Sequence, residues 1–130
     1  MNLGKESISL LKGRILCTDD NSDTRELVFL MLQSSGHDVI CVGSSAEALD
    51  LLKREKFDLV VLDNWMPGIT GTELTRMIRE FDKTTPILFY SAAAYEADKQ
   101  AALDAGAQRY LTKPDGIEHL LDEVDKLIAK

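Results

Sequence analysis

Carboxylate, hydroxyl and ammonium side chains stand at the ends of short apolar segments of this chain. Asp19 and Asp20 follow one segment, Asp63 follows another, and Ser91 and Lys113 follow two more. Three carboxylates close together repel one another, and a hard divalent cation such as Mg²⁺, which prefers oxygen ligands, removes that conflict. An aspartate can also act as a nucleophile and become an aspartyl phosphate. The residue types therefore indicate Mg²⁺-dependent phosphoryl transfer, which needs mainly positioning and charge neutralisation.

The apolar segments that must position these residues are predicted to be β-strands. They cover residues 14–18, 37–42, 57–62, 86–90 and 109–112. Continuous apolar runs such as Leu59 to Leu62 are typical of parallel strands that are covered on both faces. Because the carboxyl ends of the strands form the binding crevice of an open α/β sheet, we expect the charged residues to meet in one pocket.

Helical segments alternate with the predicted strands. They cover residues 22–34, 46–52, about 72–81, about 94–104 and about 117–129. In the first helix we expect Leu27, Leu30 and Met31 to form the apolar stripe. Ser44 or Ser45 is expected to cap the second helix. The alternation predicts parallel strands joined by right-handed crossovers, and therefore a single doubly wound α/β domain.

Length and composition fit one domain. The chain has 130 residues, of which we assign 1–11 to a polar leader and 12–130 to the domain. A formal net charge of -7 and the lack of a Lys/Arg-rich run argue against direct binding to nucleic acid or anionic lipid. No apolar run approaches the roughly 20 residues of a membrane span, and no secretory signal is recognisable. We therefore expect a cytoplasmic protein.

Neither the cysteines nor the histidines are spaced as metal ligands. Cys17 and Cys41 both fall inside predicted strands, and buried, reduced thiols are the expectation for a cytosolic protein. His37 and His119 are expected at the surface, because neither neighbourhood indicates a ligand or a phosphohistidine.

Taken in order along the chain, these motifs resemble the receiver domain of bacterial two-component response regulators, of the chemotaxis-regulator kind. The resemblance covers about residues 12–130. The motifs that carry it are Asp19-Asp20, Asp63 with Met66-Pro67-Gly68, Ser91-Ala92, Ala105-Gly106-Ala107, Tyr110 and Lys113-Pro114. It implies a flavodoxin-like (βα)5 domain whose five-stranded parallel sheet has the order 2-1-3-4-5.

The resemblance also implies a role for each acidic residue. Asp63 would be the phosphoacceptor. Asp20 would bind Mg²⁺ directly, with Asp19 assisting through water. The backbone carbonyl of Trp65 would be a further metal ligand, so that Mg²⁺ is the expected cofactor.

The same resemblance implies how the phosphoryl group is held and sensed. Lys113 would pair with a phosphoryl oxygen, and the peptide bond between Lys113 and Pro114 would be cis. Ser91 would close on the phosphoryl group, and Tyr110 would turn inward as Ser91 moves. The surface that switches would be formed by the fourth helix, the fifth strand and the fifth helix.

Three positions depart from the pattern of this family. Trp65 stands two residues after the phosphoacceptor, where small or polar residues are more familiar, and its indole can shield the phosphoryl group from water. Ala93, two residues after Ser91, offers no polar group that could orient water. Both departures predict slow loss of the phosphoryl group. Asp115-Gly116 replaces an expected apolar aromatic residue, which bears on contacts built on the last strand and helix.

The function expected from the resemblance is that of a stand-alone phosphoacceptor, which catalyses only its own phosphorylation and dephosphorylation. The donor would be a histidine kinase or a histidine phosphotransfer protein, and the output would go to an unknown protein target. We expect a monomer or a weak, phosphorylation-dependent dimer.

Three alternatives compete with this function. A degenerate receiver would serve only as a protein-binding module, although every residue needed for phosphorylation is present. A phosphatase with an aspartate nucleophile needs a second acid two residues after Asp63, where Trp65 stands. A flavodoxin-like cofactor carrier needs a phosphate-binding loop rich in Ser, Thr and Gly, whereas the loop at 19–23 is acidic.

Overall fold

Five parallel strands form one sheet in the computed structural model, which describes residues 12–113 and 117–129. The strands are β1 (Arg14–Thr18), β2 (Asp38–Val42), β3 (Leu59–Leu62), β4 (Ile87–Ser91) and β5 (Arg109–Thr112). Their order in the sheet is β2-β1-β3-β4-β5, and every neighbouring pair is parallel. The predicted doubly wound architecture and its strand order are thereby confirmed.

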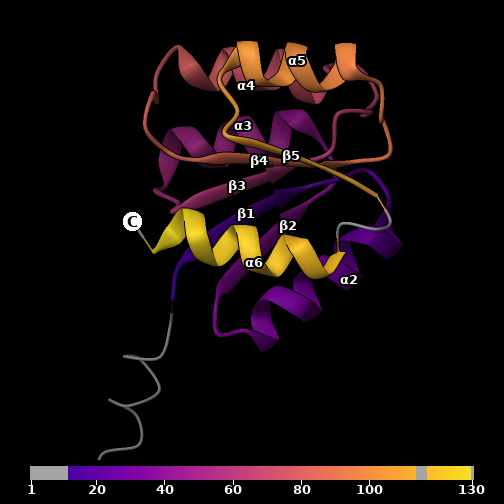
Figure 1. Cartoon of the computed structure of the whole chain (residues 1–130). Helices are drawn as coiled ribbons and strands as arrows, with labels where there is room; N and C mark the ends of the chain where they lie inside the picture. The colour runs from indigo at the N-terminus through magenta and orange to yellow at the C-terminus, as the bar shows by residue number, and fades with distance from the viewer. Residues whose placement is uncertain (1–11, 114–116, 130) are drawn as a thin grey trace, which may run out of the picture.

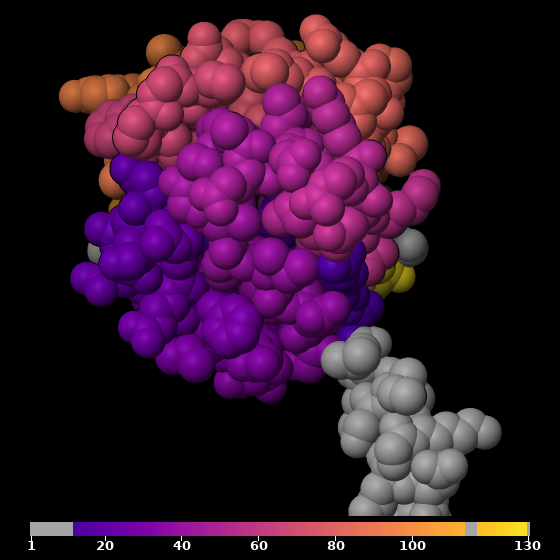
Figure 2. Space-filling model, turned by 180° about the vertical axis from the view of Figure 1, so that it is seen from behind, coloured from indigo at the N-terminus to yellow at the C-terminus, as the bar shows by residue number. Residues whose placement is uncertain are grey.

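Helices cover both faces of the sheet (Figure 1). They are α2 (Ser22–Ser34), α3 (Ser45–Arg54), α4 (Gly71–Arg79), α5 (Glu96–Ala105) and α6 (Ile117–Ile128). One face is covered by α3, α4 and α5, and the other by α2 and α6. Seen from behind, α2 and the segment that follows it form the lower part of the surface, and the segments from α4 to α5 form the upper part (Figure 2).

The core therefore has two layers, one on each face of the sheet. Successive side chains of a strand point to opposite faces. In β1, Ile15 and Cys17 pack toward α2 and α6, whereas Leu16 packs toward α3, α4 and α5. Burial of such aliphatic side chains contributes about 1.5–3 kcal/mol each, and it fixes which way every strand faces.

Side-chain caps define where three of the helices begin. Asn21 caps α2. Ser44, one of the two predicted candidates, caps α3 by accepting a hydrogen bond from the backbone N–H of Glu47. Ser45 is buried instead, and its hydroxyl donates to the carbonyl of Ile69 at 2.9 Å. Helix α4 begins with a complete capping box in which Thr70 and Glu73 satisfy each other's backbone N–H groups.

The buried face of α2 differs from the predicted one. Val28 and Leu32 are completely buried, whereas Leu27 and Leu30 are 47% and 53% exposed and Met31 is only partly buried. Positions four apart lie on one face of a helix, so Val28 and Leu32 form the true stripe. The prediction was wrong because Leu27, Leu30 and Met31 also keep helical spacing, so the sequence offers two apolar stripes and only the packing of α2 on the sheet selects Val28 and Leu32.

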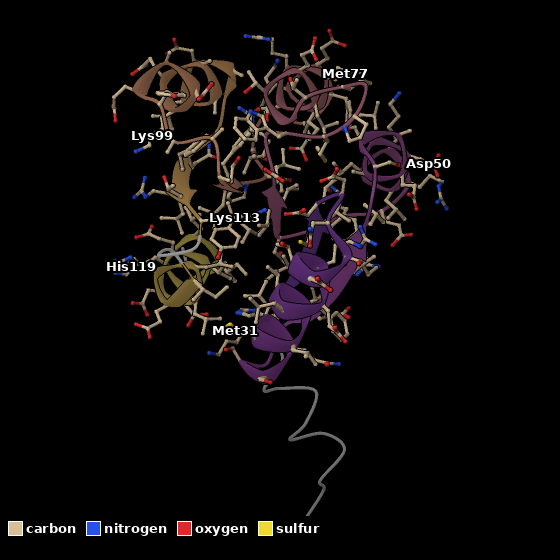
Figure 3. All side chains as sticks on the ribbon, turned by 90° about the vertical axis from the view of Figure 1, so that its right-hand side faces the viewer. Met31, Asp50, Met77, Lys99, Lys113 and His119 are labelled. Carbon is tan, nitrogen blue, oxygen red and sulfur yellow. The ribbon has the colours of Figure 1, made fainter. Side chains whose placement is uncertain are left out.

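His37 is buried, which corrects the expectation that it lies at the surface. Only 2% of the residue is exposed. Its Nε2 lies 3.0 Å from Oδ1 of Asp125, so the pair joins the start of β2 to α6. His119 is exposed on α6, as expected (Figure 3).

Some predictions fall on residues that the structure does not describe. The leader at 1–11, the peptide bond at Pro114 and the Asp115-Gly116 pair lie outside the described residues. Among the residues that are described, no helix combines the length and the apolar character needed to cross a membrane.

Candidate functional site

Three carboxylates meet at the C-terminal edge of the sheet. Asp19 and Asp20 follow β1, and Asp63 follows β3. One oxygen atom of each residue lies within 4.8 Å of the others. Thr18 and Leu62, the last residues of the two strands, are paired in the sheet, which places the residues after them side by side. Asp19 and Asp63 are buried and Asp20 is exposed, so the group opens to solvent on one side.

Among the ion pairs of the described residues, Lys113 is the only cationic side chain that contacts these carboxylates. Its Nζ donates a hydrogen bond to Oδ2 of Asp19 at 2.8 Å and a longer one to Oδ2 of Asp63 at 3.4 Å. The lysine follows β5, and its side chain is mostly buried. In Figure 3 it lies toward the centre of the molecule, whereas His119 lies at the outer surface. The predicted lysine thus reaches both buried carboxylates, and lies closer to Asp19.

Burial and charge oppose each other at this site. Burial raises the pKa of Asp19, and the hydrogen bonds from Lys113 and the backbone of Asn21 only partly offset that rise. Burial alone would lower the pKa of Lys113, but the hydrogen bond and charge of Asp19, followed by the charge of Asp63, outweigh it and raise the pKa. The lysine therefore stays protonated at neutral pH.

The donor set fits a hard divalent cation. Three carboxylates face one ammonium group, so negative charge is in excess when the carboxylates are ionised. Mg²⁺ prefers such oxygen ligands, and usually keeps waters and a substrate phosphate as further ligands. The exposed Asp20 leaves the group accessible from solvent.

Backbone contacts hold Asp19 and Asp63 in place. The N–H of Asp63 donates to the carbonyl of Thr18 at 3.0 Å, and the N–H of Asp19 donates to the carbonyl of Val42 at 3.2 Å. Arg25 in α2 donates from its guanidinium to the carbonyl of Asp19 at 2.8 Å. Asp19 and Asp63 are therefore each held by a backbone hydrogen bond to the neighbouring strand.

Asn64 is a buried residue of the site that the sequence reasoning did not single out. Its Oδ1 accepts hydrogen bonds from the N–H and the hydroxyl of Thr72, at 3.0 and 2.9 Å. Gly71 approaches so closely that a Cβ there would lie 2.9 Å from the Cα of Asn64. The loop after Asp63 is thereby fixed to the start of α4. The available signal was an asparagine that directly follows the strand-end aspartate.

Ser91 and Tyr110 form the other side of the site. Ser91 is completely buried, and its Oγ accepts hydrogen bonds from the N–H groups of Ala93 at 3.2 Å and Asn64 at 3.4 Å. The ring of Tyr110 stacks on Phe89 with 5.3 Å between ring centroids. Its hydroxyl donates to the carbonyl of Ala93 at 2.6 Å. Tyr110 therefore lies inward, bonded to the loop that follows Ser91.

Trp65 and Ala93 lie in contrasting surroundings. Trp65 is 58% exposed, and its N–H donates to Oδ1 of Asp63 at 3.3 Å. Ala93 is completely buried, and its backbone bonds to both Ser91 and Tyr110. The exposure of Trp65 shows that much of the indole faces solvent, so the shielding that the sequence predicts stays a prediction.

Known proteins resemble this chain both in sequence and in structure. The sequence model described as the response regulator receiver domain matches residues 15–125. The response regulator MprA of Mycobacterium leprae is 36% identical over 117 residues, which are 90% of this chain and 51% of that protein. The chain spans about half the length of this and of other curated relatives it matches.

Two solved structures show the same architecture at over 30% identity. The chemotaxis response regulator CheY4 of Vibrio cholerae is 31% identical with a TM-score of 0.82, covering 88% of this chain and 97% of that one. The response regulator TrrA of Thermotoga maritima, solved in complex with Mg²⁺-BeF, is 32% identical with a TM-score of 0.81 and the same coverage. The chain therefore belongs to the family of response regulator receiver domains, the signalling modules of two-component systems.

Proposed function

We propose that Asp63 accepts a phosphoryl group from a phosphohistidine donor in a reaction that requires Mg²⁺. The observation that carries this proposal is the meeting of three carboxylates from two neighbouring strands with the ammonium group of Lys113. Asp63 is the one carboxylate of the three that lies at the end of the central strand β3. The donor would be a histidine kinase or a histidine phosphotransfer protein, which the cytoplasmic location expected from the sequence allows.

Each residue at the site has a distinct task in this reaction. An oxygen of Asp63 attacks phosphorus, the phosphorus–nitrogen bond of the donor breaks, and the imidazole leaves with its electron pair. Asp19, Asp20 and the backbone carbonyl of Trp65 would hold Mg²⁺ together with Asp63. Bound there, Mg²⁺ supplies charge neutralisation and orients the transferred group. Lys113 would hold a phosphoryl oxygen and keeps its proton, because the acidic neighbours raise its pKa.

The buried hydroxyl of Ser91 is suited to sense the product. It accepts two backbone N–H hydrogen bonds and keeps its own proton available for donation to a phosphoryl oxygen. A movement of Ser91 changes the loop at Ala93, to which Tyr110 is bonded. A partner that reads the surface around α5, β5 and α6 would then detect phosphorylation.

The test is incubation with Mg²⁺ and acetyl phosphate, followed by intact-mass measurement. We expect one added phosphoryl group that hydroxylamine removes. Asp63→Asn should abolish it, whereas Asp122→Asn, which changes an exposed aspartate on α6, should leave it unchanged. Labelling of the Asp63→Asn variant at full stoichiometry would contradict the assignment. No labelling of the wild-type protein would favour a degenerate receiver that acts only as a binding module.

A further inference from the structure

The two cysteines face each other on neighbouring strands. Cys17 in β1 is paired with Cys41 in β2. Both side chains pack on the face of the sheet that α2 and α6 cover. Both thiols are free in the structure. Two cysteines on one face, at the same level of adjacent strands, form a pair rather than two isolated thiols.

The spacing of the strands brings the pair close to disulfide geometry. Neighbouring strands lie about 4.7–4.9 Å apart, and disulfide-linked Cα atoms lie roughly 4.4–6.8 Å apart. Linked Cβ atoms, however, average about 3.8 Å, so the strands must approach slightly. β2 lies at an edge of the sheet, so it can move toward β1. A bond closed in this way carries some strain and is readily reduced.

The two thiols differ in how a small oxidant reaches them. Cys17 is completely buried, whereas Cys41 is partly exposed. The Cys41 thiol contacts the backbone carbonyl of Arg25, with 3.7 Å between sulfur and oxygen. The neighbouring Cys17 thiol lowers the pKa of Cys41, burial opposes this effect, and the charge of Arg25 supports it. Cys41 is therefore the thiol that reacts first with an oxidant.

We propose that Cys17 and Cys41 are a redox modification site that forms a reversible intramolecular disulfide with peroxides. The sulfur of Cys41 attacks one peroxide oxygen, the oxygen–oxygen bond breaks, and the leaving oxygen departs as water with the thiol proton. The sulfur of Cys17 then attacks the sulfenic acid, and the hydroxyl group leaves as a second water with the Cys17 proton. Two thiols are oxidised by two electrons, and hydrogen peroxide is reduced to two waters.

The disulfide would affect the acidic site because residues next to both cysteines also contact Asp19. Asp19 lies two residues after Cys17, and its N–H is bonded to Val42, which follows Cys41. Arg25, whose carbonyl contacts the Cys41 thiol, also holds the carbonyl of Asp19. Closing the bond therefore displaces Asp19. This consequence rests on the proposed function, and changes around metal ligands weaken metal affinity by roughly tenfold or more.

The disulfide itself is tested by mass, independently of any metal. After treatment with hydrogen peroxide, the protein should lose two hydrogens, remain monomeric and have no titratable thiol when denatured. Dithiothreitol should restore both thiols. Cys17→Ala and Cys41→Ser should each prevent the loss of two hydrogens. The proposal is overturned if the wild-type protein only gains oxygen, keeps both thiols or forms a dimer linked between chains.

The coupling is tested by Mg²⁺ titration of the reduced and oxidised protein, with the fluorescence of Trp65 as the signal. We expect the Mg²⁺ concentration at half-saturation to rise by roughly tenfold on oxidation and to return with dithiothreitol. An unchanged midpoint in the oxidised protein overturns the coupling. A reduced protein that shows no response to Mg²⁺ contradicts the proposed function instead, and the mass measurement alone then decides the disulfide.

Discussion

Lys113 lies between the buried carboxylates of Asp19 and Asp63, and its contribution to the stability of the fold depends on whether they are ionised. The fold raises the pKa of Asp19 above 3.8, so it favours the protonated carboxyl group. The stability that this preference contributes is fully present below pH 3.8, and it is lost as the pH rises through the pKa that Asp19 has in the folded protein. The ammonium group of Lys113 offsets part of that loss.

Lys113→Met should therefore destabilise the protein at neutral pH and less so in acid. The expected loss at pH 7 is about 1–3 kcal/mol, because two buried carboxylates lose a charged partner. Urea unfolding at pH 7 and pH 4 measures it. Lys126→Met, which removes an exposed lysine on α6, is the matched control. Equal losses in the two variants, or a larger loss at pH 4, would contradict this role for Lys113.

Ser91→Ala should separate phosphoryl acceptance from the structural response. The variant keeps Asp63 and the acidic group, so it should still be labelled by acetyl phosphate. Amide shifts in the loop at Ala93 and in β5 should change far less on phosphorylation than in the wild-type protein. Loss of the Ser91 hydroxyl also leaves two backbone N–H groups without their acceptor, at a cost of about 1–3 kcal/mol. Wild-type shift changes in the variant would refute the switch role.

The lifetime of the phosphoryl group can be tested cleanly only at Trp65. Trp65 is more than half exposed, so Trp65→Asn changes little of the core. Ala93 is completely buried, and a glutamate there would bury a carboxylate without a partner. If the indole shields the phosphoryl group, Trp65→Asn should speed the decay of the phosphorylated protein, followed by intact mass over time. Equal decay rates would show that the indole does not shield it.

At the scale of helices and strands, the sequence predicts those features that depend on local patterns of apolar and polar residues. Four of the five strands are short apolar runs that end in a polar site residue, so the meeting of Asp19, Asp63 and Lys113 could be expected from topology. The pairing of His37 with Asp125 could not, because neither residue follows the carboxyl end of a strand, and the contact depends on how α6 packs against the sheet. The role of Asn64 was missed because it depends on how the loop after β3 returns to Thr72 at the start of α4.

The segment after α4, which contains Asp82, makes a pH-dependent contribution to the stability of the fold, and this contribution does not involve the acidic site. Burial alone would raise the pKa of Asp82, but hydrogen bonds from Thr85 and Thr84 outweigh it and lower the pKa below 3.8. The stability that Asp82 contributes is present above pH 3.8 and is lost as the pH falls through the folded value.

Asp82→Asn should therefore cost about 0.5–1 kcal/mol at neutral pH, a value discounted because the group is largely solvated. The cost should shrink as the pH falls below 3.8, which urea unfolding across that range would measure. Asp104→Asn, at an exposed aspartate of α5, is the control. A cost that grows in acid would mean that the hydrogen bonds to Thr84 and Thr85 do not favour the ionised carboxylate.

At the scale of the whole molecule, Mg²⁺ should stabilise the fold by binding the folded state alone. The melting temperature should rise with millimolar Mg²⁺ in the wild-type protein, because the cation relieves repulsion among the three carboxylates. Asp20→Asn removes an exposed carboxylate of this group, and it should lose most of the rise while folding normally. A melting temperature that rises equally in both proteins would indicate binding elsewhere.

The central claim is that one carboxylate, that of Asp63, receives the phosphoryl group. The most direct measurement is to phosphorylate the protein with acetyl phosphate, reduce the acyl phosphate with borohydride, and locate the resulting homoserine by peptide mass spectrometry. We predict homoserine at position 63 alone among the aspartates of the chain, and only when Mg²⁺ is present. Homoserine at another aspartate, or equal modification without Mg²⁺, would contradict the account.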